Sequence, residues 1–373
     1  MSAPIKVLIV DDSALVRKML NEMLSSDPEI EVVGTAFDPF DAREKIKLLH
    51  PDVLTLDVEM PKMDGVTFLK NLMRLHPMPV VMVSTLTEKG ADVTFEAMDL
   101  GAIDFVTKPK IDLAHTFEDY THEICSKIKT AAKVNKSTLE RQYSRYVANL
   151  KSQPVVARAK ADTGKLAADA IIPKTQFSKR HFKTTDKIIA LGASTGGTEA
   201  IKEVLMRLPA NTPGIVITQH IPAAFSLPFA KRMNTVTEMT VFHAEDGQQI
   251  LPGHVYIAPG DKHLMVVRDG ARYVCRLHDG PPVNRHKPAV DVMFRSVTQN
   301  VGQNAVCVLL TGMGADGAVG MKEMQAAGAP TIAQDEKTSV VWGMPGEAVK
   351  LGAANHVLSL NKIPEKILEL ASR

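Results

Sequence analysis

Residues 187–209 read KIIALGASTGGTEAIKEVLMRLP, and this stretch decides the fold of the half of the chain that contains it. The apolar run KIIALGA predicts a buried strand, STGG predicts a tight turn, and the following apolar residues have helical spacing. A strand that enters a helix through a glycine turn is typical of α/β domains with a parallel sheet. Similar apolar runs follow at residues 214–220, 254–260, 305–312 and 330–334. We therefore predict a doubly wound α/β domain over residues 187–373, with a β-hairpin around VRDGARYV (267–274).

The N-terminal half repeats this alternation on a smaller scale. Its apolar runs are KVLIV (6–10), EVVGTA (31–36), DVLTL (52–56), PVVMVS (79–84) and IDFVTK (103–108), and amphipathic stretches separate them. Five strands alternating with helices indicate a parallel sheet with helices on both faces. The prediction for residues 1–124 is a flavodoxin-like domain with a five-stranded parallel sheet.

The segment between the two halves, residues 125–186, is basic and lacks strand patterns. From Lys127 to Lys187 the chain carries 15 Lys or Arg and four Asp or Glu. We expect an interdomain linker that is helical over residues 125–150 and irregular after Pro154. Basic residues and aromatic residues are not interleaved here, so a solvated tether is a better interpretation than a nucleic-acid interface.

Composition limits the class of protein. The chain has 373 residues, of which 45% are hydrophobic and 23% charged, as in ordinary globular domains. Its three cysteines, Cys125, Cys275 and Cys307, are widely spaced and form no zinc-ligand pattern. No segment is apolar over the roughly 18 residues that a membrane span requires. We expect a cytoplasmic protein without a membrane insertion.

Five polar residues follow strands of the N-terminal half. They are Asp11, Asp12, Asp57, Ser84 and Lys108. Carboxyl ends of parallel strands lie at one sheet edge, and three carboxylates gathered there favour a Mg²⁺ ion. Asp57 ends the central strand and is the expected phosphoacceptor, with Ser84 and Lys108 placed to contact the phosphoryl group. The alternative for Asp12 is a helix cap before SALVRKML.

Ser194 lies in a G-x-S-x-G pattern, Gly192 to Gly196, which is typical of a nucleophile elbow. A glycine-serine turn after a strand can equally bind phosphate, so the serine needs a base and an orienting acid. His220 ends the run GIVITQH, and Asp316 lies in the turn after AVCVLL, with Asp335 after PTIAQ as a rival. The order Ser, His, Asp differs from that of α/β-hydrolases and predicts a triad on another fold.

The motifs VDDS, LDVEMPKMDG and FVTKP make residues 1–124 similar to response-regulator receiver domains. The resemblance implies phosphotransfer from a histidine kinase to Asp57, with Asp11, Asp12 and Asp57 at the Mg²⁺ ion. It also implies that Phe105 is the aromatic residue whose rotamer reports phosphorylation.

GASTGG, ITQHIP, HVYIAPG, RHKPAVDVMF and LLTGMGADG stand in the order found in chemotaxis protein-glutamate methylesterases, which the C-terminal half resembles. The resemblance implies a triad of Ser194, His220 and Asp316, ranks Asp335 below Asp316, and assigns the oxyanion to backbone amides of Thr195 and Met313. It further implies a catalytic domain without cofactor, stimulated by receiver phosphorylation. The substrates that the resemblance implies are γ-methyl esters of glutamate and certain glutamines of chemoreceptors. The size of this half argues against a DNA-binding output domain.

Overall fold

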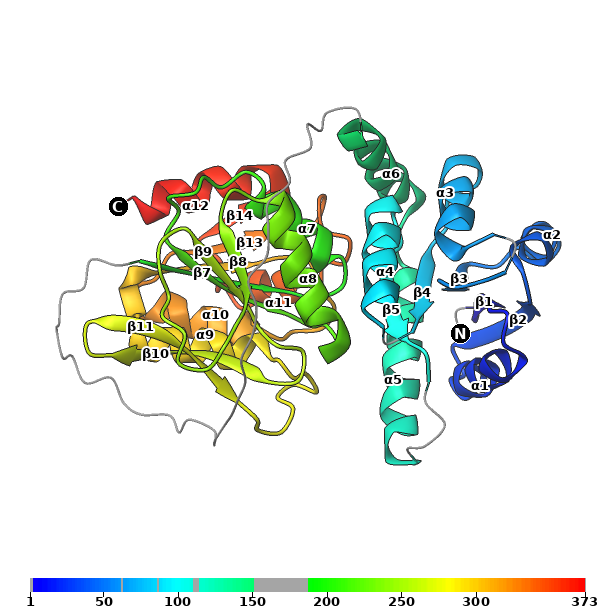
Figure 1. The fold of residues 1–373 in the computed structure, drawn as a ribbon, viewed down its shortest axis with the longest axis horizontal. Helices are drawn as coiled ribbons and strands as arrows, with labels where there is room; N and C mark the ends of the chain where they lie inside the picture. The colour runs from blue at the N-terminus through cyan, green and yellow to red at the C-terminus, as the bar shows by residue number, and fades with distance from the viewer. Residues whose placement is uncertain (1–2, 62, 86, 110–113, 151–186, 373) are drawn as a thin grey trace. The chain divides into compact units, whose positions relative to one another are not determined.

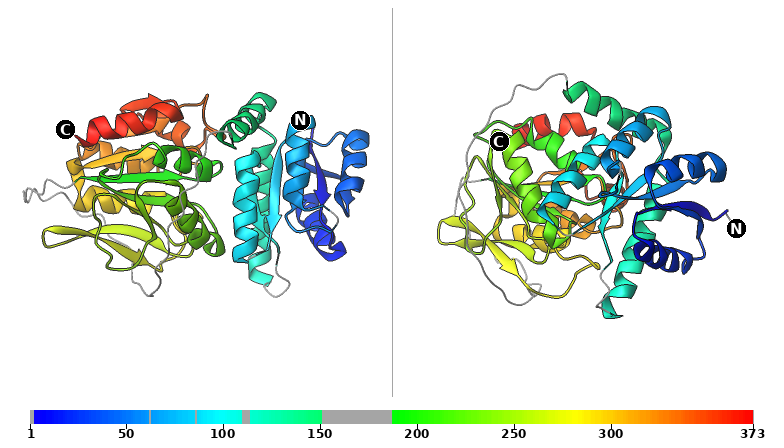
Figure 2. Two further views of the ribbon diagram at one scale, coloured as in Figure 1. Left: turned by 45° about the horizontal axis from the view of Figure 1, so that its top comes forward. Right: turned by 45° about the vertical axis from the view of Figure 1, so that its right-hand side comes forward.

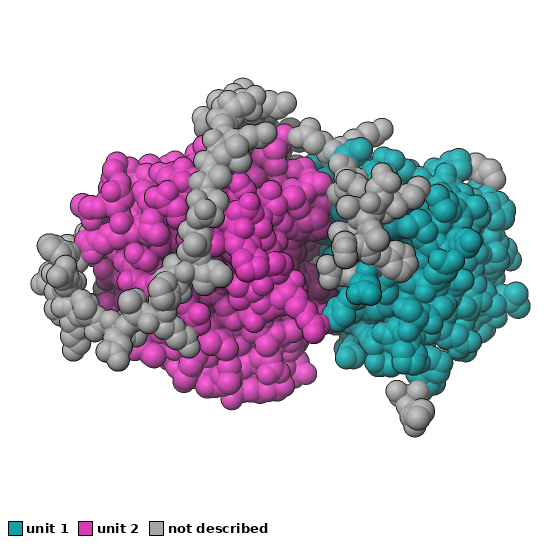
Figure 3. Space-filling model, turned by 90° about the horizontal axis from the view of Figure 1, so that it is seen from below, with its two compact units in different colours: residues 1–155 teal, residues 156–373 magenta. Residues whose placement is uncertain are grey.

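The computed structural model describes residues 3–61, 63–85, 87–109, 114–150 and 187–372. The chain divides into two compact units, residues 1–155 and residues 156–373 (Figure 3). Each unit has its own sheet and its own core.

The first unit contains a five-stranded parallel sheet in the order β2-β1-β3-β4-β5. The strands are β1 (Ile5–Val10), β2 (Ile30–Ala36), β3 (Val53–Asp57), β4 (Val80–Ser84) and β5 (Asp104–Thr107). All residues of β3 and β4 are buried, because helices cover both faces of the sheet (Figure 1). This confirms the predicted flavodoxin-like sheet.

The described part of the first unit also contains helices, and the first four of them begin at polar caps. They are α1 (Ala14–Ser25), α2 (Pro39–Leu49), α3 (Gly65–Leu75), α4 (Glu88–Leu100), α5 (Ala114–Ala131) and α6 (Lys136–Leu150). Ser13, not Asp12, caps α1 by accepting a hydrogen bond from the Val16 amide, which leaves the Asp12 carboxylate for another role. Helix α6 packs against α3 and α4, so the first unit takes in helices of the segment expected to be a linker. The irregular part expected after Pro154 lies outside the described residues.

The second unit is built on a seven-stranded parallel sheet in the order β14-β13-β12-β6-β7-β9-β8. Its strands are β6 (Ile188–Ala193), β7 (Gly214–Gln219), β8 (Thr240–His243), β9 (His254–Ile257), β12 (Ala305–Leu309), β13 (Thr331–Gln334) and β14 (His356–Leu358). From β6 the chain builds β7, β8 and β9 on one side and later β12, β13 and β14 on the other. The two directions diverge at β6, and such a switch point is where parallel sheets open a crevice at their carboxyl edge.

Helices flank both faces of this sheet (Figure 2). They are α7 (Gly197–Leu205), α8 (Ala223–Val236), α9 (Val290–Asn300), α10 (Ala318–Ala326), α11 (Met344–Lys350) and α12 (Ile363–Ala371), with short 3₁₀ turns η1 (Gly302–Asn304) and η2 (Leu360–Lys362). An antiparallel hairpin, β10 (His263–Asp269) and β11 (Arg272–His278), confirms the predicted hairpin. Val290, Met293 and Phe294 of α9 are fully buried in the core, which fixes α9 close to the end of β6.

No helix in the described ranges has both the length and the apolar character needed to cross a membrane.

Candidate phosphoacceptor site and candidate active site

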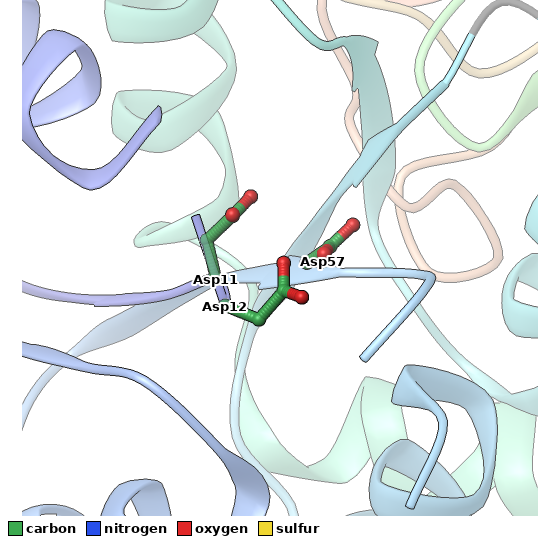
Figure 4. A group of neighbouring side chains, drawn as sticks. All are labelled: Asp11, Asp12 and Asp57. Atoms are coloured by element: carbon green, nitrogen blue, oxygen red, sulfur yellow. The ribbon is translucent and has the colours of Figure 1, made fainter. Parts of the chain in front are cut away.

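Three carboxylates lie together at the carboxyl edge of the first sheet (Figure 4). Asp11 follows β1 and Asp57 ends β3, and both are fully buried, whereas Asp12 is exposed. Oxygen atoms of all three lie within 4.8 Å of one another. Lys108 follows β5, and its Nζ lies 2.8 Å from Oδ2 of Asp57 and 3.2 Å from Oδ2 of Asp11. Four of the five predicted residues therefore meet at this edge.

The buried carboxylates are poorly compensated. Burial and then the charge of Asp11 raise the pKa of Asp57 to about 6, against the opposing effect of Lys108. Burial likewise raises the pKa of Asp11. The Oδ2 atoms of Asp11 and Asp57 share a single ammonium, that of Lys108. Two buried carboxylates that share one cation and lie within 4.8 Å of a third acid fit a hard divalent cation such as Mg²⁺.

Ser84, at the end of β4, is held by a buried hydroxyl pair. Its Oγ lies 2.8 Å from Oγ1 of Thr94 in α4, and both hydroxyls lie within hydrogen-bond distance of the Gly90 carbonyl, at 3.2 Å and 2.6 Å. Both side chains are fully buried. The hydroxyl predicted to meet a phosphoryl group is therefore engaged with α4 in this structure.

Phe105 in β5 is buried and packs edge-on against Phe95 of α4, with ring centroids 6.0 Å apart. Lys127 of α5 lies with its Nζ 5.5 Å from the Phe105 ring centroid and donates to the Phe105 carbonyl at 2.6 Å. The same ammonium pairs with Asp104 and Glu123. The predicted switch residue is thus in an inward position, fixed by both ring and backbone contacts.

In the second unit, Ser194 follows β6 in a crowded turn. Its amide donates to the Thr311 carbonyl at 3.0 Å, and its own carbonyl accepts from the Gly197 amide and from Nε2 of Gln219. Gly196 has a φ of 75°, which favours glycine, and the backbone leads directly into α7. The serine therefore lies at the N-terminal end of a helix, as expected for a nucleophile elbow.

Ser194 and His220 lie on neighbouring strand ends. Ala193 and Gln219 are partners in the β6–β7 register, and the His220 amide donates to the Ala193 carbonyl at 3.1 Å. The side chain of His220 is only 8% exposed. Its Nε2 lies 2.8 Å from Oδ2 of Asp316, and its buried Nδ1 has no hydrogen-bond partner among the described residues. The contact assigns the Nε2 hydrogen to Asp316 and leaves Nδ1 as the basic nitrogen.

The rival acid, Asp335, serves a local turn. Its Oδ1 accepts from the amide and the hydroxyl of Thr338, and its amide donates to the Leu358 carbonyl. Asp316, in contrast, joins the histidine to α9, because its two oxygens also accept from the Val290 and Asp291 amides. The geometry therefore pairs His220 with Asp316 rather than with Asp335.

The Asp316 carboxylate is held in its ionised form. Burial opposes ionisation, but hydrogen bonds from His220, Asn284 and Val290 and the histidine charge outweigh it and lower the pKa of Asp316 to about 2. A buried anion beside Nε2 stabilises positive charge on the imidazole. The two residues predicted to serve the oxyanion lie close to Ser194 in different ways. Thr195 directly follows it in sequence, and Met313 belongs to a turn that approaches it in space, since a Cβ on the adjacent Gly312 would come within 2.8 Å of the Ser194 Cβ.

A two-residue turn that the sequence analysis did not assign to the site also reaches this cluster. Val283 and His286 exchange both backbone hydrogen bonds around Asn284 and Arg285, which have φ values of 53° and 69°. This is a type I′ turn, in which asparagine is favoured but arginine is not. Asn284 donates to Oδ1 of Asp316 at 2.8 Å, and the His286 ring stacks on His220 with centroids 3.7 Å apart. A paired Asn-Arg turn is not a recognisable turn signal, so sequence alone offered little to find it.

A receiver-type acidic edge and a serine, a histidine and an aspartate gathered at a switch point define a class, a response regulator joined to a hydrolase domain with a doubly wound sheet. Comparisons with protein families agree. The family described as response regulator receiver domain matches residues 7–117, and the family described as CheB methylesterase matches residues 189–367. The chain belongs to the protein-glutamate methylesterase/protein-glutamine glutaminase family.

Individual relatives match over nearly their whole length. The protein-glutamate methylesterase/protein-glutamine glutaminase of Hydrogenovibrio crunogenus is 74% identical and covers 99% of this chain and 99% of its own. A relative named protein-glutamate methylesterase/protein-glutamine glutaminase 1, from Xanthomonas campestris pv. campestris, is 56% identical and covers 100% of this chain and 99% of its own. The CheB methylesterase catalytic domain of Thermotoga maritima, a crystal structure, is 39% identical over 50% of this chain and 98% of that chain, with a TM-score of 0.49.

Proposed function

We propose that this protein hydrolyses γ-methyl esters of glutamate on chemoreceptors, and deamidates particular glutamines, under control of its receiver domain. One observation carries the catalytic part of the proposal. His220 is bound through Nε2 to the anionic Asp316 and presents an unpartnered Nδ1 at the strand end beside Ser194. Membership of the methylesterase family supplies the substrate class.

In the acylation step, Ser194 Oγ attacks the ester carbonyl while Nδ1 of His220 accepts the hydroxyl proton. The imidazolium that forms is stabilised by Asp316 through Nε2. Backbone amides of Thr195 and Met313 are the donors proposed for the oxyanion. Collapse of the tetrahedral intermediate breaks the C–O bond to the methoxy group, and His220 gives its proton to the departing oxygen, so that methanol leaves.

In the deacylation step, His220 Nδ1 accepts a proton from water, whose oxygen attacks the acyl carbonyl, and Ser194 leaves with that proton. The product is a glutamate side chain. The same sequence on a glutamine side chain releases ammonia in place of methanol, so one set of residues serves both reactions.

In the receiver, Asp57 would accept a phosphoryl group from a histidine kinase, through attack of a carboxylate oxygen on phosphorus with cleavage of the P–N bond. Asp11, Asp12 and Asp57 would hold Mg²⁺, which supplies charge neutralisation at the phosphoryl oxygens. Lys108 is placed to bind another phosphoryl oxygen, and Ser84 could reach one after leaving Thr94.

The test is methanol release from methylated receptor membranes by the full chain. Ser194→Ala should lower the rate by roughly a millionfold, because no acyl enzyme forms. The control is Ser226→Ala, since Ser226 in α8 is also bonded to a histidine, but to His243 and not to His220. Retention of a tenth of the activity by Ser194→Ala would exclude the proposed nucleophile. A serine-directed covalent reagent that fails to label the wild-type chain would favour a phosphate-binding turn instead.

A further inference from the structure

Two buried helix ends next to the triad cap each other. Asp316 precedes α10, yet its carboxylate accepts from the amides of Val290 and Asp291, the first two residues of α9, at 2.6 Å and 3.1 Å. Asp291 of α9 in turn accepts from the amide of Gly320 in α10, at 2.7 Å. Each acid therefore satisfies backbone donors at the positive end of the other helix. This exchange fixes the Asp316 carboxylate against the N-terminal end of α9.

The Asn284 side chain joins the same two carboxylates. Its Nδ2 lies 2.8 Å from Oδ1 of Asp316 and 2.8 Å from Oδ2 of Asp291, so its two hydrogens are directed to different acids. The residue is exposed, and its left-handed backbone conformation is one that asparagine adopts readily. A surface side chain with both hydrogens directed inward, to two different carboxylates, indicates that the turn delivers this amide to them.

Charged and polar groups from several elements surround Asp291. The Asp316 carboxylate repels it, and hydrogen bonds from Asn284 and Gly320 stabilise its charge. The charge of Asp291 also acts on Arg295, one turn further along α9, and on the buried Cys307 thiol of β12. Burial, followed by Asp316, raises the pKa of Asp291 to about 6. Arg295 is engaged by Glu323 of α10 in a two-pronged ion pair at 2.7 Å and 2.9 Å.

We propose that Asp291 and Asn284 are positioning residues of the hydrolase, which hold Asp316 with Oδ2 toward His220 and add a second negative charge behind the triad. This inference rests on the proposed triad. Neither residue touches the proposed reacting atoms, and their effect passes through Asp316. Since Asp291 supports the imidazolium only when ionised, its contribution is present above about pH 6 and is lost as the pH falls through that value.

Three variants of the full chain test the proposal. Asp291→Asn keeps the shape and the acceptor for Gly320 but removes the charge and sets an amide against the Asn284 amide. Asn284→Gly removes only the side chain, because glycine adopts the left-handed conformation without strain. The control is Glu323→Gln. It also neutralises a carboxylate, but one that lies on α10 and binds Arg295 and not Asp316.

We expect kcat to fall about tenfold for Asp291→Asn and several-fold for Asn284→Gly at pH 7.5, with KM changed by less than twofold. The double variant should be little worse than Asp291→Asn, since both act through one contact. The ratio of wild-type to Asp291→Asn activity should shrink toward one at pH 5, where wild-type Asp291 is protonated. Glu323→Gln should match wild type at every pH.

A ratio independent of pH, with both single variants reduced, would show a structural role and overturn the proposal. A raised KM at unchanged kcat in Asn284→Gly would assign the amide to substrate binding and overturn it equally. If the thermal midpoint shows that Asp291→Asn is unfolded, the same comparison is made with Asn284→Gly. The ratio of wild-type to Asn284→Gly activity across the pH range then tests the proposal. Ser194→Ala is measured alongside: its failure to inactivate the enzyme removes the triad itself, whereas an inactive Ser194→Ala with unaffected Asp291→Asn removes only this inference.

Discussion

His220 turns its Nε2, not its Nδ1, toward Asp316, at 2.8 Å. In the familiar serine-protease arrangement, Nδ1 faces the acid and Nε2 faces the serine. Here the roles of the nitrogens are exchanged, which follows from where the acid lies: Asp316 reaches His220 from the loop between β12 and α10, across the end of β6. The nitrogen proposed as the base, Nδ1, is therefore the one closer to the histidine backbone, at the β7 end.

Asp316→Asn should lower kcat by roughly 10⁴-fold, because the amide sets the wrong imidazole tautomer and removes the charge that stabilises it. Asp335→Asn should lower it less than fivefold, since Asp335 is bound to Thr338. Single-turnover methanol release from both variants measures this. If Asp335→Asn proves the more damaging, the assignment of the orienting acid is wrong.

Gly312→Ala should inactivate the enzyme without abolishing folding of the receiver. An added Cβ would come within 2.8 Å of the Ser194 Cβ and 2.3 Å of the Met344 sulfur, so the nucleophile turn must shift, at a cost of about 1–3 kcal/mol. Gly270→Ala is the control, because that glycine has a φ of 60° but open space around it. We expect only the first variant to lose labelling by a serine-directed reagent. Equal labelling would place the reactive serine elsewhere.

Mg²⁺ binding to the receiver should weaken as the pH falls through about 6, by roughly tenfold per pH unit. The cause is protonation of Asp57, whose pKa burial and Asp11 raise to about 6, because a metal ligand must be ionised. Calorimetric titration with Mg²⁺ between pH 7.5 and pH 5 provides the affinity and the proton release. Asp57→Asn should bind weakly with a flatter pH profile. If the Mg²⁺ affinity stays unchanged between pH 7.5 and pH 5, Asp57 is not a ligand of the ion.

Thr94→Val should raise the affinity of the receiver for beryllofluoride, a phosphoryl mimic, by about threefold to tenfold. The substitution removes the hydroxyl that holds Ser84 toward α4 in the unmodified state, a hydrogen bond worth about 0.5–1.5 kcal/mol. Thr94→Ser keeps a hydroxyl at this position and should behave like wild type. Weaker binding by Thr94→Val would mean that Thr94 supports the modified state instead.

Asp57→Ala should leave basal esterase activity intact and remove its stimulation by a small-molecule phosphodonor with Mg²⁺. The reason is that the buried Asp57 ends the central strand and is the proposed phosphoacceptor. Glu59→Gln serves as control, since Glu59 is exposed and contacts Asp57 only through its backbone amide. Stimulation that persists in Asp57→Ala would locate the phosphoacceptor at another residue.

The residues at the strand ends were predictable because apolar runs mark the strands, and the carboxyl ends of parallel strands lie at one edge of the sheet. Asp57, Lys108, Ser194 and His220 all directly follow apolar runs. Strands β6 and β7 are neighbours, which brings Ser194 and His220 to adjacent strand ends, whereas the long Lys108 side chain reaches Asp57 across the end of β4. Asp291 and Asn284 could not be predicted in this way. Their roles depend on a left-handed turn and on two helix ends that are separate in sequence but lie together in the fold. The choice of Nε2 on His220 is likewise a product of tertiary placement.

The order in which β6 acquires its two neighbours has a consequence for synthesis of the chain on the ribosome. Ser194 and His220 emerge early, with β6 and β7, but Asp316 follows only after β12, the strand that completes the other side of β6. A nascent or prematurely terminated chain therefore displays a serine and a histidine without their acid and without the α9 end that fixes it. We expect such a fragment to lack esterase activity, because the acid that completes the proposed triad is translated last of the three residues.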